Sequence, residues 1–406
     1  MRVLYLCHRT PFPPDKGEKI RAFQQLRALA AGHNQVDLFT LDDSPSDLQG
    51  QSELLRYCRQ VTVVPLNRQW KKVSSLLYLP TDRPLTLPYF YSAMLARKIR
   101  EALASRSYDR IFVFCSSMFQ YVESVEDIPI LLDLQDVDSD KWFQYADYCR
   151  FPHSWIYRRE GETLRNYERW ICEKASLVTV LTEREARVLR SITTKANIEI
   201  VPNGVDTQYF SPRNGARAAS PPTMVFTGAM DYFPNVEAVR FFALSVFPAV
   251  RQSFPEARFV IVGGRPSPKV RALERIPGVT VTGRVPDIRP YLDQAHLFVA
   301  PLRLATGIQN KILEALAMAL PVLAMPRPVQ GISPKVASYI DVAESPDEWI
   351  RKTLDHLTHR ETVTVKAVEA RSKLVTEYDW GSSLGRLLSL LASEQVVVGN
   401  SYAACG

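Results

Sequence analysis

The sequence predicts an α/β protein made of two doubly wound, Rossmann-like domains that face a central cleft. Short β-branched or aromatic runs alternate with longer helical stretches, which is the pattern of parallel strands joined by crossover helices. This alternation stops once, at a segment rich in turn-forming residues, and then restarts. A chain of 406 residues, 46% of them hydrophobic, is long enough to build two cores.

Charge and composition narrow the classes of function. The formal net charge of +7 favours an anionic partner. The basic residues are dispersed and show no zinc-finger or ribonucleoprotein signature, so we do not expect nucleic acid to be that partner. Six scattered cysteines indicate neither a disulfide framework nor a metal site. We find no signal peptide or membrane-spanning run in the sequence and therefore expect a cytoplasmic protein.

The first domain is predicted to span residues 1–205. Its strands are expected at residues 3–7, 36–41, 61–64, 111–115, 130–134, 177–181 and 198–201. Helical patterns between them cover residues 19–31, 94–105 and 160–175. Turn-forming and small residues then dominate at 202–206 and 211–222, as expected for a linker between domains.

The second domain is predicted to span residues 206–377, followed by a helix and tail at 378–406. Its strands are expected at residues 224–227, 258–262, 279–282, 297–300 and 321–324, with helices at 236–251, 288–294 and 308–319. Open parallel sheets bind ligands outside the carboxyl ends of their strands. The loops that follow the strands therefore carry the candidate site.

One such loop leads into an almost wholly apolar helix that carries Lys311 and Glu314. A helix start preceded by Gly307 offers unpaired N–H groups and partial positive charge, which suit a diphosphate. Lys311 adds a full charge, and Glu314 on the same face can accept both hydroxyls of a ribose. An ordinary ion pair between Lys311 and Glu314 is the alternative. The scarcity of other polar residues on this helix favours a nucleotide.

Two further loops of the second domain carry glycine after a strand. Gly228 lies in the first of them, and Asn235 is expected to cap the helix that follows. Gly264 and Arg265 lie in the second. Each glycine alone is as well explained by a turn as by a ligand. Their repetition in one domain favours the ligand.

The first domain has a proline-rich loop after its first strand. It contains Gly17 and four cations: Arg9, Lys16, Lys19 and Arg21. These cations could contact a donor phosphate or an anionic acceptor. A solvated basic helix start explains them equally well.

Carboxylates gather after the strand at residues 130–134, where Asp136, Asp138 and Asp140 follow Gln135. Their spacing does not match an EF-hand loop, and we predict no metal. Acceptor binding is slightly favoured over helix capping by Asp138 or Ser139.

Residues 68–79 mix cations with Trp, Leu and Tyr. This segment could lie on the anionic inner face of a membrane and bring the protein to a lipid-linked acceptor as a peripheral protein. A packed helix with a basic outer face is the more common arrangement for such a segment.

Taken together, these residues resemble the family-4 glycosyltransferases of the GT-B fold. Residues 162–168 and 175–183 are similar to the helix and strand before the family's linker, and residues 201–206 are similar to its interdomain signature. Residues 378–380 resemble the start of the family's last helix, which crosses back to the first domain. Within the family, the chain is similar to a bacterial subgroup associated with exopolysaccharide synthesis and protein sorting.

This resemblance implies retaining transfer of a sugar from a UDP- or GDP-type nucleotide-diphosphate sugar to a glycan or lipid-linked acceptor, without a cofactor. The departures from the family lie at the site. Thr306 replaces the first glutamate of its paired-glutamate motif, and Gln135 replaces its active-site histidine. Ala229 and Pro234 stand where its phosphate loop has arginine and lysine. By resemblance to variants of the family, Lys311 and Arg303 would supply the missing charge.

The predicted site therefore has three groups of residues. The predicted catalytic residues are Lys311, Arg303 and Asp138. The predicted donor-binding residues are Gly228, Gly264, Arg265, Thr306, Gly307, Ile308, Asn310, Lys311 and Glu314. The predicted acceptor and phosphate loop comprises Lys16, Gly17, Arg21 and Asp136.

Two other classes of function stay open at this point. A GT-B protein that binds a nucleotide sugar without transferring it is one, because Gln135 and Thr306 replace expected polar groups. A dinucleotide oxidoreductase is disfavoured, because the first strand leads into a proline-rich loop instead of a Gly-x-Gly-x-x-Gly turn.

Overall fold

The computed structural model describes residues 1–14, 16–42, 50–213, 221–305 and 307–393. The chain divides into two compact units. The first contains Met1–Pro202 and the chain from Gly381 onward, and the second contains Asn203–Trp380.

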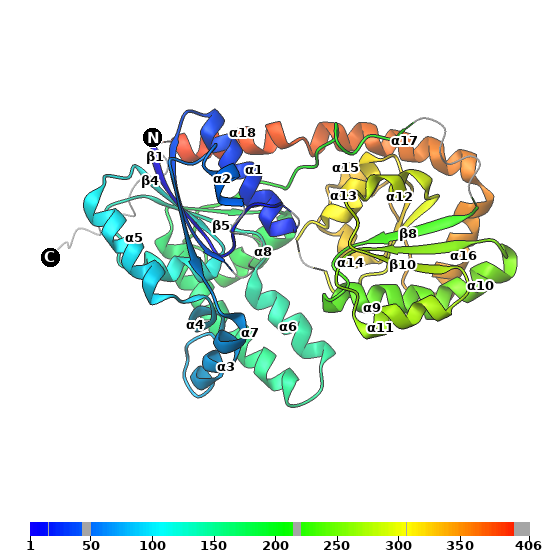
Figure 1. The fold of residues 1–406 in the computed structure, drawn as a ribbon, viewed down its shortest axis with the longest axis horizontal. Helices are drawn as coiled ribbons and strands as arrows, with labels where there is room; N and C mark the ends of the chain where they lie inside the picture. Colours follow the sequence, from blue (N-terminus) through cyan, green and yellow to red (C-terminus); the bar gives the residue numbers. More distant parts are fainter. Residues whose placement is uncertain (15, 43–49, 214–220, 306, 394–406) are drawn as a thin grey trace. The chain divides into compact units, whose positions relative to one another are not determined.

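The first unit is built on a seven-stranded parallel sheet in the order β3-β2-β1-β4-β5-β6-β7. Its strands are β1 (Arg2–Cys7), β2 (Gln35–Asp42), β3 (Gln60–Pro65), β4 (Arg110–Phe114), β5 (Ile130–Leu134), β6 (Leu177–Val180) and β7 (Ile198–Ile200). Helices cover both faces of this sheet (Figure 1), so its central strands read as continuous apolar runs.

The helices of the first unit follow the strands in βα order. They are α1 (Gly17–Ala31), α2 (Gln51–Leu54), α3 (Arg68–Ser75), α4 (Thr86–Phe90), α5 (Ala93–Ser105), α6 (Asp138–Tyr148), α7 (His153–Lys174) and α8 (Glu183–Ile192), with 3₁₀ turns η2 (Leu76–Tyr78) and η3 (Ser116–Tyr121). The last helix, α18 (Trp380–Ala392), is counted with this unit from Gly381 onward. Arg386 of α18 forms a 2.6 Å ion pair with Glu199 of β7.

The second unit has a six-stranded parallel sheet in the order β10-β9-β8-β11-β12-β13. Its strands are β8 (Thr223–Thr227), β9 (Arg258–Val262), β10 (Val279–Gly283), β11 (Leu297–Ala300), β12 (Val322–Ala324) and β13 (Asp341–Val342). Its helices are α9 (Phe233–Phe241), α10 (Phe247–Ser253), α11 (Pro268–Arg271), α12 (Arg289–Gln294), α13 (Asn310–Ala317), α14 (Pro326–Val329), α15 (Pro334–Ala337), α16 (Pro346–Thr358) and α17 (Arg360–Glu377), with a π-helical turn η4 (Phe242–Val246) and a 3₁₀ turn η5 (Ala272–Arg275). The predicted pair of doubly wound α/β domains is confirmed.

One continuous helical stretch of the described residues, Phe233–Ser253, is long and apolar enough to cross a bilayer by length and composition. In the most apolar 18-residue part of this stretch, 56% of the residues are buried inside the unit. Phe242, Val246 and Phe247 are fully buried in the core beneath the second sheet. The stretch is apolar because it is a core helix of this unit.

Candidate functional site

Lys311 lies in the first turn of α13, at the carboxyl end of β8 in the second unit. Its Nζ atom donates a 2.6 Å hydrogen bond to Oδ1 of Asn235 and lies 4.6 Å from the centre of the Phe226 ring. Asn235 in turn donates from Nδ2 to the carbonyl oxygen of Ala229 at 2.9 Å. The contacts of Lys311 and Asn235 therefore join α13, the start of α9 and the loop after β8 into one cluster.

Gly228 lies against this cluster, and only glycine fits there. Its φ of +155° is rarely adopted by other residues, and a Cβ atom would lie 2.7 Å from Nδ2 of Asn235 and 3.1 Å from Nζ of Lys311. The predicted place of Gly228 beside the helix of Lys311 is thus what the structure has. Asn235, in contrast, does not cap α9, because Tyr232 occupies the N-cap position.

The loop after β9 packs onto the same place through Gly263, which the sequence prediction missed. A Cβ atom on Gly263 would lie 1.7 Å from the carbonyl oxygen of Gly228, and its φ is +156°. A Cβ atom on Gly264 would make only an ordinary 3.5 Å contact with Arg284. The close packing of the two loops therefore requires glycine at position 263, whereas the sequence prediction named Gly264. Two adjacent glycines after a strand were the available signal.

The segment before α13 has the expected glycine geometry. Gly307 is buried and has a φ of +59°, in the left-handed region that favours glycine. Gln309 is the N-cap residue and makes no side-chain capping hydrogen bond. Ile308 is buried, and Asn310 accepts a 3.1 Å hydrogen bond from Asn203. The predicted donor residue Thr306 lies outside the described residues.

Lys311 and Glu314 are both partly buried, and their charges are poorly solvated. Burial lowers the pKa of Lys311 to about 7, and the Glu314 carboxylate opposes this shift only in part. Burial raises the pKa of Glu314 to about 7, against a smaller opposing effect of Lys311. A site that disfavours both charges is typical of a functional position.

The alternative of a plain ion pair between Lys311 and Glu314 is not realised. No ion pair joins them among the described residues, where Lys311 turns to Asn235 instead. Within the same part of the chain, the Glu314 carboxylate has neither a hydrogen-bond donor nor a cation in contact. Glu314 is thus an acceptor available to a ligand, one turn along α13 from an ammonium group.

The two arginines predicted near the donor have other partners. The Arg303 guanidinium is exposed and lies over the ring of Phe241, 5.0 Å from its centre. Phe241 ends α9, six residues or about 9 Å of helix beyond Asn235. Arg265 is 58% exposed and pairs with Asp231 at 2.9 Å. Their roles in catalysis and donor binding stay predictions.

In the first unit, the structure corrects the assignment of Arg21. Its side chain is fully buried, and its guanidinium donates to both carboxylate oxygens of Asp133, at 2.8 and 2.7 Å. Gln25 and Thr179 donate to the same carboxylate. Burial would raise the pKa of Asp133, but the charge and hydrogen bonds of Arg21 outweigh it and hold that pKa below its usual value. Arg21 is therefore a core residue and not a ligand-binding cation.

The other residues of that loop are spread between the core and the surface. Arg9 pairs with Glu18 at 2.6 Å, and Lys19 is 3% exposed. Lys16 is the N-cap residue of α1, which begins at the exposed Gly17. A ligand role for Lys16 and Gly17 stays a prediction.

Asp138 is the first residue of α6, so neither Asp138 nor Ser139 takes the N-cap position, which is Val137. The Asp138 carboxylate accepts a 2.9 Å hydrogen bond from Ser116 and lies 3.5 Å from Nζ of Lys141. Asp136 is partly buried in the turn between β5 and α6. The catalytic role of Asp138 and the acceptor role of Asp136 stay predictions.

Next to this carboxylate cluster lie two residues that the sequence prediction missed. His8 follows β1 and Cys115 follows β4, the strand adjacent to both β1 and β5. Nδ1 of His8 lies 3.3 Å from Sγ of Cys115. Burial lowers the pKa of His8 to about 3, so its imidazole is neutral, and burial raises the pKa of Cys115 to about 12. Their position directly after strands was the signal that could have found them.

No group of three or more His, Cys, Asp or Glu side chains within the described ranges is arranged to hold a metal ion.

The two α/β units, with glycines after parallel strands of the second unit, have the architecture of the GT-B glycosyltransferases. A family model described as Glycosyltransferase Family 4 matches residues 17–209, and one described as Glycosyl transferases group 1 matches residues 221–359. The chain belongs to the family-4 glycosyltransferases.

A glycosyltransferase subunit of known identity is similar to about half of the chain. Over 211 residues the chain is 28% identical to one of the subunits of phosphatidylinositol N-acetylglucosaminyltransferase from Arabidopsis thaliana. That match covers 49% of this chain and 44% of the relative, so the chain spans less than half of that relative's length.

Solved structures of GT-B glycosyltransferases match almost the whole chain. Sucrose-phosphate synthase from Thermosynechococcus elongatus superposes with a TM-score of 0.73 at 18% identity, covering 96% of this chain and 98% of that one. Anabaena HepE in complex with UDP-glucose gives a TM-score of 0.67 at 14% identity, covering 97% and 99%. These similarities establish the fold.

Proposed function

We propose that this glycosyltransferase moves a sugar from a UDP- or GDP-type nucleotide sugar to a glycan or lipid-linked acceptor, with retention of the anomeric configuration. The observation that carries the proposal is the pairing of a desolvated lysine with an unengaged glutamate at the start of α13. Structures with the same fold contain UDP and UDP-glucose, which supports a nucleotide sugar as donor.

The donor fits the second unit in the following way. The diphosphate lies at the amino end of α13, beside Gly228, where the helix N–H groups and the Lys311 ammonium attract negative charge. Gly228 and Gly263 let the two loops pack closely around Lys311, because a Cβ atom at either position would collide with protein atoms. Glu314 accepts hydrogen bonds from the ribose hydroxyls, which supplies the donors that its carboxylate lacks.

In the reaction, the bond between the anomeric carbon and the diphosphate oxygen breaks, and the electron pair leaves with the diphosphate. The acceptor hydroxyl forms the new bond to the anomeric carbon and gives its proton to the departing diphosphate. Negative charge grows on the leaving oxygen in the transition state, so a fixed positive charge there accelerates the reaction. Lys311 has this role in the proposal, and the reaction needs no cofactor.

The acceptor is assigned to the first unit, where Asp138 lies near Ser116 and Lys141. Asp138 serves there as the carboxylate that orients an acceptor hydroxyl. We propose a role in exopolysaccharide or other cell-surface polysaccharide synthesis. A cytoplasmic enzyme that uses a lipid-linked acceptor would act as a peripheral protein at the inner membrane face.

The test is release of UDP or GDP from candidate sugar donors in the presence of glycan or lipid-linked acceptors. Lys311→Ala is expected to lower turnover about a hundredfold while the fold survives. Lys335→Ala is the matched control, because that lysine is 74% exposed on α15 and pairs only with Glu377 among the described residues. Saturable donor binding without nucleotide release, across all acceptors, would contradict transfer.

A further inference from the structure

Helix α3 in the first unit has its apolar face turned to solvent. Trp70, Val73 and Leu77 recur at helical spacing through α3 and η2, and they are 66%, 61% and 78% exposed. The opposite face, which includes Ser75 and Lys71, lies against the unit, and burial lowers the pKa of Lys71. An ordinary surface helix does the reverse and hides its apolar stripe. The alternative of a packed helix with a basic outer face is therefore wrong for these residues.

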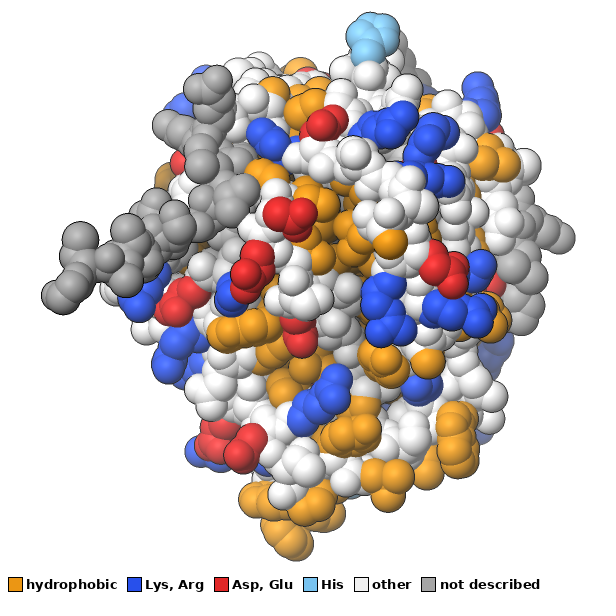
Figure 2. Space-filling model, turned by 90° about the vertical axis from the view of Figure 1, so that its left-hand side faces the viewer, with side chains coloured by type: hydrophobic (Ala, Val, Ile, Leu, Met, Phe, Trp, Pro, Cys, Tyr) orange, Lys and Arg blue, Asp and Glu red, His pale blue; other side chains and the backbone are white. Residues whose placement is uncertain are grey.

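A second exposed apolar site lies at the turn between α6 and α7. Phe151 is 81% exposed and Trp155 is 54% exposed. Figure 1 shows this turn and α3 at the same end of the first unit. In Figure 2, hydrophobic side chains gather at the lower end of the molecule, with lysine and arginine side chains above them.

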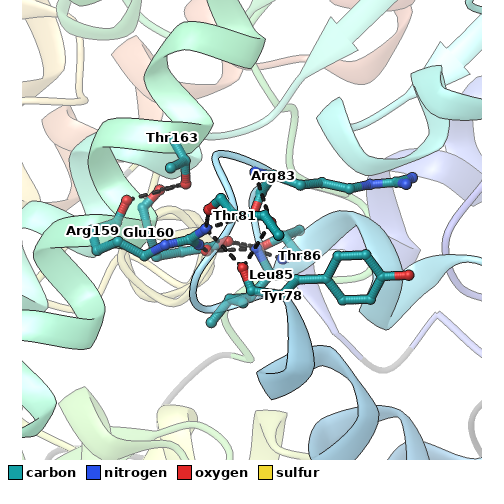
Figure 3. Close-up of polar contacts among 8 residues, drawn as sticks. All are labelled: Tyr78, Thr81, Arg83, Leu85, Thr86, Arg159, Glu160 and Thr163. Atoms are coloured by element: carbon teal, nitrogen blue, oxygen red, sulfur yellow. Dashed lines mark hydrogen bonds and ion pairs between the residues drawn. The ribbon is translucent and has the colours of Figure 1, made fainter.

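A polar clamp fixes the two apolar sites to each other (Figure 3). Arg159 of α7, one turn beyond Trp155, donates to the carbonyl oxygens of Tyr78, Thr81 and Arg83, at 3.1 Å from Tyr78 and 2.9 Å from Arg83. These bonds hold the segment after η2 against α7.

The neighbouring Glu160 completes the clamp. Its buried carboxylate accepts from the N–H groups of Leu85 and Thr86, at 2.7 and 2.9 Å, and from the Thr86 hydroxyl at 2.8 Å. Because Thr86 begins α4, the carboxylate also lies at a helix amino end, where negative charge is stabilising. The exposed apolar side chains therefore project from a rigid base and not from a loose loop.

The charge around these side chains is positive. Between Arg68 and Arg83 the sequence has four cations and one acid, Asp82. Lys72 and Arg83 are exposed, and the Arg83 guanidinium lies 5.7 Å from the centre of the Tyr78 ring. Arg150 adds a further exposed cation beside Phe151. We call the set Trp70, Lys72, Val73, Leu77, Phe151 and Trp155 the apolar-basic surface.

We propose that the apolar-basic surface binds the face of an anionic phospholipid bilayer, with its aromatic and leucine side chains among the lipid headgroups and its cations at the phosphates. Exposed tryptophans flanked by lysine and arginine suit this interface, since each has an apolar body and the cations attract anionic lipid. A second copy of the chain fits less well, because two such surfaces would bring like charges together. The surface belongs to the first unit and the donor residues to the second, so vesicle binding and UDP binding can be measured separately.

The experiment is co-sedimentation of the full chain with vesicles of phosphatidylcholine alone, and of phosphatidylcholine mixed with phosphatidylglycerol in equal amounts. Wild type is expected to bind the mixed vesicles and to be released by salt. Lys72→Gln with Arg83→Gln should weaken binding about 25-fold, at about fivefold for each cation. Trp70→Ser with Leu77→Ser should weaken it at least about tenfold.

Val365→Ser with Val368→Ser is the control, because these α17 side chains are 60% and 56% exposed but lie in the second unit. Binding of UDP by every variant reports separately on the donor site. Unchanged vesicle binding by the Trp70 and Leu77 variant would overturn the proposal. So would a wild-type dimer in light scattering that the same variant converts to monomer, without vesicle binding by either.

Discussion

The ammonium group of Lys311 donates a 2.6 Å hydrogen bond to the side-chain oxygen of Asn235, which joins the first turn of α13 to the first turn of α9. The lysine is thereby held in one position beside Gly228 before any ligand arrives. Fixed charge of this kind costs no reorganisation during a reaction. Asn235 is therefore the residue that positions Lys311 in the proposed donor site.

Asn235→Ala should weaken nucleotide binding about tenfold, because Lys311 loses the acceptor that holds it. Asn235→Asp keeps an acceptor for Lys311 but sets a carboxylate oxygen against the Ala229 carbonyl and adds negative charge beside the diphosphate, so it should recover little of the affinity. Titration calorimetry with UDP and GDP measures both variants. Equal affinities for wild type and Asn235→Ala would show that the hydrogen bond does not position the lysine.

Lys311→Met should raise the free energy of unfolding of the ligand-free protein by about 1–2 kcal/mol near pH 7, because the buried charge is removed at nearly constant volume. The folded-state pKa of Lys311 is lowered from 10.5 to about 7, so the unfolded chain binds more protons between these values. Wild-type stability then rises with pH across this window, and the gain from the substitution shrinks. Urea denaturation of wild type and Lys311→Met at several pH values measures this difference in the free energy of unfolding.

Glu314→Gln should also stabilise the ligand-free protein, with the opposite pH dependence. The pKa of Glu314 is raised from 4.5 to about 7, so the folded state binds more protons in this range. The penalty for the charge is fully present above pH 7 and disappears as the pH falls toward 4.5. A loss of stability in both Lys311→Met and Glu314→Gln would mean that the two charges support the fold and not a ligand.

Gly263→Ala should destabilise the second unit by about 3 kcal/mol or more, since its Cβ atom would collide with the carbonyl oxygen of Gly228. Gly264→Ala is the matched control and should change stability by less than about 1 kcal/mol. Thermal and urea denaturation of the two variants compare adjacent positions in one loop. Equal effects would contradict the assignment of the tight contact to Gly263.

Arg21→Met should cost about 3–5 kcal/mol of stability, because it leaves the buried Asp133 carboxylate without its cation. Arg56→Met is the control, since Arg56 is 68% exposed and should change stability by less than about 0.5 kcal/mol. The lowered pKa of Asp133 stabilises the fold above its unfolded pKa, and this contribution is lost in acid. A small effect of Arg21→Met at neutral pH would return that arginine to the list of ligand-binding candidates.

Much of the fold was predictable because buried parallel strands are continuous apolar runs, as β11 and β12 are. The strand β13 was missed because two residues are too short for any periodicity. One helix was predicted at residues 236–251, where the structure has α9, the π-helical turn η4 and α10. The apolar pattern runs through all three, so only the backbone hydrogen bonds distinguish them.

Site residues could be predicted where a residue type is unusual in its local sequence. Lys311 and Glu314 stand out as charges on an apolar helix, and Gly307 as a glycine before it. The partners of Arg21 and Lys311 were not predictable, because Asp133 is 112 residues from Arg21 and Asn235 is 76 residues from Lys311. Sequence context alone could not show that Arg21 points into the core while a neighbouring cation stays near the surface.

The central claim is that Lys311 binds a nucleotide diphosphate, and titration calorimetry of UDP and GDP against wild type and Lys311→Met tests it most directly. Because the pKa of Lys311 is about 7, the advantage of wild type over the variant should fall about tenfold between about pH 6 and about pH 8. Wild type should also take up a proton on binding at the higher pH, and the variant should not. Equal affinity of both proteins for both nucleotides, at both pH values, would contradict the claim.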